Sequence, residues 1–193
     1  MEKRNEVSYY PEIMDFIKTQ IESNFRASQN PLTVYCKTGE LKKGLAEIIS
    51  ENEITTQSII DFANNTPPLS LDIFALITDG RDYELLIIEV KLLDNVGLSQ
   101  LSQLIGYCIV SNAQYGLLVN VNGGESQRLV DLLSNEPDVT YIRRILSHDN
   151  RLVEHNLGVM EWDSEMQNLY YSGYGRVETI SKLCGMLATK FTP

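Results

Sequence analysis

The chain has 193 residues, of which 43% are hydrophobic and 22% charged, and its 16 basic and 26 acidic side chains give a net charge of −10. This length and composition are typical of one soluble globular domain over residues 1–193, and no apolar run approaches the roughly 18 residues that a membrane span needs. The negative charge counts against a protein that binds nucleic acid through a broad basic face, although a local site on such a chain remains compatible with it.

The cysteines and the N-terminal residues point to the cytoplasm. Cys36, Cys108 and Cys184 are odd in number and far apart in the sequence, which favours reduced thiols over a disulfide framework. No Cys-x-x-Cys pair is available for a zinc or iron–sulfur site. The first residues are polar and no apolar signal core follows them, so we expect a cytoplasmic protein.

The first third of the chain predicts helices around a short strand. Apolar residues at three-and-four spacing predict an amphipathic helix over residues 8–27, either a packing helix or an arm that contacts DNA or a second copy. Residues 32–36 are typical of an edge strand, and residues 40–52 predict a second helix. Residues 54–63 are ambiguous, and their β-branched side chains slightly favour a strand.

Two apolar runs in the middle of the chain predict a β-hairpin. Leu71–Thr78 and Tyr83–Val90 have strand length, and Asp79-Gly80 lies between them as a turn. Both runs are almost continuously apolar, which is typical of central strands that are covered on both faces.

The rest of the chain alternates between predicted helices and strands. We expect helices over 98–111, 126–133 and 180–186, and strands over 115–121, 139–146 and 157–162, with a polar loop that holds His148 and His155. This order predicts an α/β fold with a mixed central sheet flanked by helices.

Three charged residues lie at the ends of the apolar hairpin strands. Because side chains alternate along a strand, Glu89 and Lys91 point to the same face, and the Val90 carbonyl lies between them. Pairing about Gly80 places Asp72 opposite a position near 88, within one residue of Glu89. Charges in this setting are paired, metal-bound or exposed at the edge of a sheet. The alternative without a functional site is a solvated Glu89–Lys91 pair, with Asp72 capping a turn.

Such a group of oxygens suits a divalent metal. Carboxylates and a carbonyl are the hard ligands that Mg²⁺ or Mn²⁺ accepts, and the bound metal activates water and neutralises charge on a phosphate. A lysine beside the metal orients the water or stabilises the transition state. We therefore expect Asp72, Glu89 and the Val90 carbonyl to bind metal.

The pattern resembles the PD-(D/E)xK nuclease superfamily, in which an aspartate opens one strand and Glu-x-Lys closes the next. Here it comprises Asp72 and Glu89-Val90-Lys91, with the usual proline displaced to Pro68. The resemblance covers about residues 40–121 and implies a restriction-endonuclease-like core. It also implies that Asp72, Glu89 and Lys91 are catalytic.

A second element matches the Gln-x-x-x-Tyr motif of the RecB-type and lambda-exonuclease-type branch of this superfamily. Gln103 and Tyr107 share one helix face, and the resemblance implies that they bind DNA or orient the lysine. Taken alone, both are ordinary helix residues. Glu47, in the predicted second helix, is a further candidate metal ligand.

The expected function is therefore a Mg²⁺-dependent nuclease that hydrolyses DNA. A homodimer is compatible with this function, since one small core offers little surface for a duplex. The alternative is a catalytically inactive nuclease-like module that mediates protein association in a defence or repair complex. The charge of −10 and the lack of a recognition domain motivate this second hypothesis.

Overall fold

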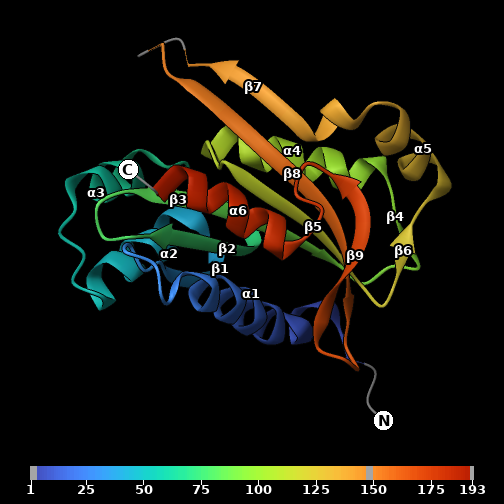
Figure 1. Ribbon diagram of the computed structural model, residues 1–193, viewed down its shortest axis with the longest axis horizontal. Helices are drawn as coiled ribbons and strands as arrows, with labels where there is room; N and C mark the ends of the chain where they lie inside the picture. The colour runs from blue at the N-terminus through green and yellow to red at the C-terminus, as the bar shows by residue number, and fades with distance from the viewer. Residues whose placement is uncertain (1–3, 147–149, 192–193) are drawn as a thin grey trace.

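The computed structural model describes residues 4–146 and 150–191, and the chain folds into a mixed sheet with helices on both faces (Figure 1). The predicted α/β class is confirmed. The seven-stranded sheet has the order β1-β2-β3-β5-β8-β7, and β9 pairs with β8 off this path. Neighbours are antiparallel except that β3, β5 and β8 run parallel.

The element bounds follow the hydrophobic pattern closely. The strands of the large sheet are β1 (Thr33–Glu40), β2 (Ser70–Thr78), β3 (Tyr83–Lys91), β5 (Tyr115–Val121), β7 (Tyr141–Ile145), β8 (Leu152–Asp163) and β9 (Asn168–Gly175). Two short strands, β4 (Asn95–Val96) and β6 (Gly124–Glu125), form a separate parallel pair. The helices are α1 (Tyr10–Phe25), α2 (Leu41–Glu51), α3 (Gln57–Asn65), α4 (Leu98–Ser111), α5 (Gln127–Asn135) and α6 (Ile180–Phe191), with 3₁₀ turns η1 (Glu6–Tyr9) and η2 (Pro137–Thr140).

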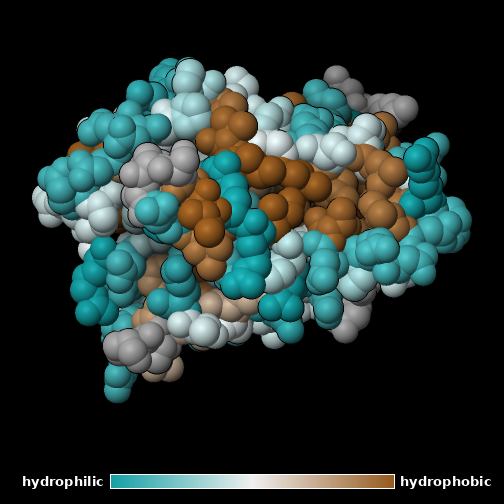
Figure 2. Space-filling view, turned by 90° about the horizontal axis from the view of Figure 1, so that it is seen from above, coloured by the Kyte–Doolittle hydropathy of each residue, from teal (hydrophilic) through white to brown (hydrophobic). Residues whose placement is uncertain are grey.

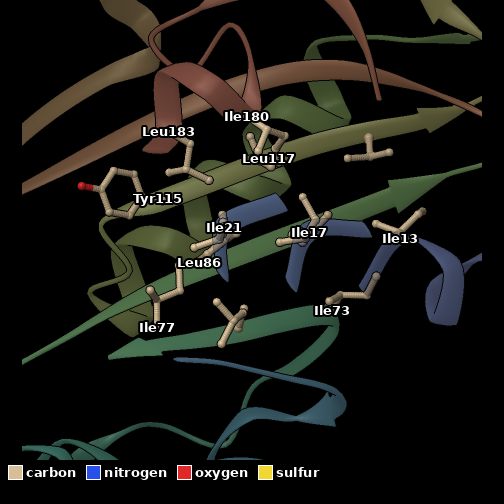
Figure 3. Packing of buried hydrophobic residues seen from close by; sticks show 14 of the residues in the cluster. Ile13, Ile17, Ile21, Ile73, Ile77, Leu86, Tyr115, Leu117, Ile180 and Leu183 are labelled. Carbon is tan, nitrogen blue, oxygen red and sulfur yellow. The ribbon is translucent and has the colours of Figure 1, made fainter. Parts of the chain in front are cut away.

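Each face of the sheet has its own hydrophobic core. On one face, α1 and α6 pack against alternate residues of the central strands, and Figure 3 shows Ile13, Ile17 and Ile21 of α1 over Ile73 and Leu86. On the other face, α2, α3, α4 and α5 contribute to a second cluster with the remaining strand residues. Burial on both faces is why β2 and β3 have nearly continuous apolar sequences.

Strand β7 is one edge of the sheet, and it carries an exposed apolar side chain. Its Ile145 pairs with Leu152 of β8, and both side chains are exposed. Figure 2 looks onto the side of the molecule where β7 lies in Figure 1, and it shows apolar surface across the middle with hydrophilic side chains at both ends.

The predicted strand over 54–63 is wrong, because the segment forms helix α3. Ile59 and Ala63 are buried one turn apart, and the Thr56 carbonyl accepts the first helical bonds from the backbone nitrogens of Ile59 (3.1 Å) and Ile60 (3.2 Å). Strand propensity is a weak signal that depends on packing, and here the helical spacing of the apolar residues decides the structure.

The polar loop predicted around His148 and His155 also needs correction. His155 lies in β8, is 0% exposed, and its Nδ1 is 2.6 Å from the Ala113 carbonyl oxygen. Strand alternation carries it inward together with Val153 and Leu157. His148 lies outside the described residues.

Two negative predictions concern membranes and disulfides. Among the described residues, no helix is both long and apolar enough to cross a membrane. Cys36, Cys108 and Cys184 are free thiols, and burial raises the pKa of all three.

A buried acid lies at the start of β3, far along this strand from the Glu-x-Lys residues that end it. Glu84 is 2% exposed, and its Oε1 lies 3.4 Å from Nζ of Lys190 on α6. Burial raises the pKa of Glu84 from 4.5 to about 7, and the Lys190 charge only partly offsets this. The folded protein therefore holds the Glu84 proton more tightly than the unfolded chain does.

This difference predicts a pH-dependent stability. The stabilisation from protonated Glu84 is full below pH 4.5 and is lost as the pH rises through about 7. We expect Glu84→Gln to raise the free energy of unfolding at pH 8 by about 3 kcal/mol, because each pKa unit is worth about 1.4 kcal/mol. At pH 4.5 the substitution should change it little. Urea titration at both pH values measures this, with the exposed Glu165→Gln as control. Equal effects at both pH values would contradict it.

Candidate metal centre

The hairpin brings the predicted acids together at the end of β3. Its turn is fixed by Asp79, whose Oδ1 accepts hydrogen bonds of 2.9 Å from the backbone nitrogens of Arg81 and Asp82, while Gly80 adopts φ +89°. The resulting register pairs Ile73 with Ile88. The next position along each strand sets Asp72 beside Glu89, within one residue of the predicted pairing.

A β-bulge aims the Asp72 side chain. Lys37 of β1 pairs with Phe74 and Gly39 pairs with Leu71, so Asp72 and Ile73 together oppose the single residue Thr38. The usual alternation fails here, because Leu71 and Ile73 pack in different cores. Bulges re-aim side chains in this way. The Asp72 carboxylate consequently accepts a hydrogen bond of 3.0 Å from the Val90 nitrogen.

Three oxygens converge on the ammonium group of Lys91. Its Nζ lies 2.6 Å from Glu89 Oε1, 2.8 Å from the Val90 carbonyl oxygen and 3.3 Å from Asp72 Oδ2. These oxygens are the ones that the sequence predicts as metal ligands. The structure therefore brings Asp72, Glu89, Val90 and Lys91 together, with a cation at their common centre.

The cluster is largely shielded from water. Glu89 is 1% exposed, and the side chains of Lys91 and Asp72 are 17% and 23% exposed. Burial raises the pKa of Glu89, and the bond from Lys91 opposes this without cancelling it. Burial by itself would lower the pKa of Lys91, but the bond with Glu89 and the charges of Asp72 and Glu89 outweigh it, so this pKa is raised.

Glu6 and Tyr10, from the N-terminal segment, join the site, and the sequence pattern did not predict this position for them. Tyr10 is buried at the start of α1, and its hydroxyl donates to Glu6 Oε1 at 3.1 Å. Burial, followed by the hydrogen bond and charge of Asp72, raises the pKa of the Tyr10 hydroxyl. The Tyr10 hydroxyl therefore lies near both Glu6 and Asp72 and donates its one proton to Glu6.

A buried amide holds the loops that border the site. Asn120 pairs with Lys91 across β3 and β5, and its Oδ1 accepts from the Leu93 nitrogen at 3.1 Å. Its Nδ2 donates to the carbonyls of Leu93 (2.9 Å) and Gly124 (3.0 Å). A side chain at Gly123 would meet the Leu93 carbonyl at 2.1 Å, so only glycine fits this close contact.

The other predicted site residues lie outside the cluster. Gln103 and Tyr107 do share a face of α4, as predicted, and Gln103 Nε2 donates to the Tyr107 hydroxyl at 3.1 Å. The contacts found for Lys91 in the described part of the chain are with the β2 and β3 residues and not with this pair. Glu47 is bound instead to Lys37 (3.1 Å) and Lys43 (3.9 Å) on the surface around α2.

The oxygen atoms at this site are ligands that suit a hard divalent cation for which the protein supplies only a few of the ligands. Over residues 4–146 and 150–191, no group of three or more histidine, cysteine, aspartate or glutamate side chains is arranged to hold a metal. Two carboxylates and one carbonyl remain at the site, and Mg²⁺ commonly binds one or two carboxylates and keeps several waters. The ligand types fit, and Lys91 lies at their centre.

Comparison with known proteins gives no match: no protein-family model, curated protein or solved structure is significantly similar to this chain.

The buried ion pair predicts strong coupling between two substitutions. Lys91→Met leaves the Glu89 carboxylate buried without its partner, so we expect the free energy of unfolding to fall by about 3 to 5 kcal/mol at pH 8. Glu89→Gln together with Lys91→Met removes both charges and should cost clearly less than the sum of the single changes. Urea denaturation of the four proteins measures the coupling. Additive effects would show that the pair contributes nothing.

Proposed function

We propose that this protein is a Mg²⁺- or Mn²⁺-dependent nuclease that hydrolyses phosphodiester bonds in DNA. The observation that carries the proposal is the convergence of two carboxylates and a carbonyl on one point, with a lysine, at the end of two buried strands. Holding these charges in a largely buried place costs free energy, and such arrangements concentrate at functional sites.

Each residue has a definite part in this proposal. Asp72, Glu89 and the Val90 carbonyl would hold the metal, which when bound makes water a better nucleophile and neutralises charge on the phosphate. The Lys91 ammonium would stabilise the phosphate charge that develops during attack. Tyr10 would border the Asp72 carboxylate, and Asn120 would fix the loop that follows Lys91.

The fold is consistent with the restriction-endonuclease-like core that we propose. Strands β1, β2 and β3 form an antiparallel meander, and α4 then connects β3 to its parallel neighbour β5. The hydrogen-bonded pair of Gln103 and Tyr107 lies on α4 and presents polar groups for a DNA phosphate.

A cleavage assay tests the proposal. The purified chain is incubated with linear, circular and single-stranded DNA, and with RNA, in Mg²⁺ or Mn²⁺. We expect metal-dependent cleavage of DNA that falls at least about 100-fold in Asp72→Asn and Lys91→Ala, the scale of losing a group that stabilises the transition state. Glu165→Gln should retain full activity because the Glu165 side chain is exposed and has no part in the proposed site. Cleavage that persists in Asp72→Asn would mean that the activity comes from elsewhere.

A second candidate function is a nuclease-like module that associates with other proteins and no longer cuts. The observation that favours it is that the Lys91 ammonium already lies against the three oxygens and supplies a positive charge to them. Calorimetric titration with Mg²⁺ separates the two candidates, because the module need not bind the ion whereas the nuclease must.

A further inference from the structure

The position of the Lys91 ammonium sets a constraint on metal binding. Its nitrogen lies 2.6 Å from Glu89 Oε1 and 2.8 Å from the Val90 carbonyl oxygen, so it is in direct contact with the oxygens that a metal would need. Mg²⁺ requires ligand oxygens at about 2.0 to 2.1 Å. A metal bound to the same oxygens would be in direct contact with the ammonium group. Two cations in contact repel each other strongly in a site that is shielded from water.

We propose that Lys91 is the resident cation of the metal-free site and that a divalent metal must expel its ammonium group before it can bind. This inference rests on the proposed function, because it concerns the same metal site. The site then has two states. In one, Lys91 neutralises Asp72 and Glu89, and in the other the metal does so while the lysine faces the incoming phosphate.

The buried carboxylate explains why the lysine stays in place without metal. Glu89 is 1% exposed, and a carboxylate at that depth is costly unless a positive partner accompanies it. The ammonium also bonds to Asp72 and to the carbonyl of Val90, so it meets three acceptors at once. This arrangement keeps the metal ligands assembled before any metal arrives.

The lysine side chain can also leave. Its ammonium group is carried by a flexible chain of four carbons. The side chain is 17% exposed, so the ammonium group lies at the border with solvent. Expulsion requires rotation of this side chain alone, since its backbone lies in the β3–β5 ladder, where Lys91 pairs with Asn120.

Competition of this kind lowers the apparent affinity for metal. A metal that binds only the lysine-out state has its affinity reduced by the fraction of molecules in that state. The exchange would make the lysine available for catalysis only when the metal is bound.

Chemical labelling of lysines tests the exchange on the unmodified full-length chain. An amine-acetylating reagent is applied with and without saturating Mg²⁺, and also with Ca²⁺, and the labelling rate at each lysine is read by peptide mass spectrometry. We expect Lys91 to react slowly without metal and at least about fivefold faster with it. Lys182, which is exposed on α6, serves as the internal control and should not change.

A variant calibrates the assay. Glu89→Gln removes the charge that makes the shortest contact with Lys91, so Lys91 should react faster in this variant even without metal. Because the comparison with metal uses the wild-type chain, it does not depend on whether Lys91 variants fold.

The outcomes separate this inference from the proposed function. Metal binding by calorimetry together with faster Lys91 labelling supports the exchange, whether or not DNA is cut. Metal binding with unchanged or slower labelling overturns the exchange and leaves the nuclease proposal standing. If calorimetry detects no binding of Mg²⁺, Mn²⁺ or Ca²⁺, both the exchange and the metal-dependent nuclease are overturned.

Discussion

The buried carboxylate of Glu89 is the constraint on which the site depends. A glutamate that is 1% exposed at the end of an apolar strand is stable only if positive charge is supplied at its side. Strand alternation places Lys91 on the same face and within reach, so the neutralising group comes from the same strand. The Glu-x-Lys spacing therefore has a structural reason that precedes any catalytic one, and the proposed chemistry uses an arrangement that the fold already needs.

The surrounding structure serves to bring a second acid to this pair and to keep it there. The hairpin register sets Asp72 beside Glu89, and next to the β-bulge its carboxylate accepts a hydrogen bond from the Val90 nitrogen. Tyr10 approaches the same carboxylate from α1, and Asn120 holds the loops beyond Lys91. Residues that are distant in the sequence, on α1 and β5, thus lie around the same cluster of charged side chains.

The sequence predicted the hairpin and its charged residues because these depend on local signals. Continuous apolar runs, an Asp-Gly turn and the two-residue period determine which strands form and, within one residue, how Asp72 faces Glu89. The prediction was wrong for α3, because it gave the β-branched residues more weight than the helical spacing of the apolar ones. It was also wrong for His155, because a polar residue was assigned to a loop although it lies in a buried strand. The contribution of Tyr10 and the bulge at Asp72 arise from tertiary packing, which leaves no pattern in a single sequence.

The role inferred for Lys91 also bears on how so acidic a chain would meet a phosphate backbone. Asp72, Glu89 and Lys91 together carry one net negative formal charge, which repels DNA. A divalent ion bound to the same oxygens would give the cluster one net positive charge, at the place where the scissile phosphate must lie. Attraction to nucleic acid would then depend on the metal instead of on a basic surface, so a net charge of −10 is compatible with the proposed substrate. Because the proposed exchange would release the lysine at the same step, its positive charge and that of the metal would act on the phosphate together.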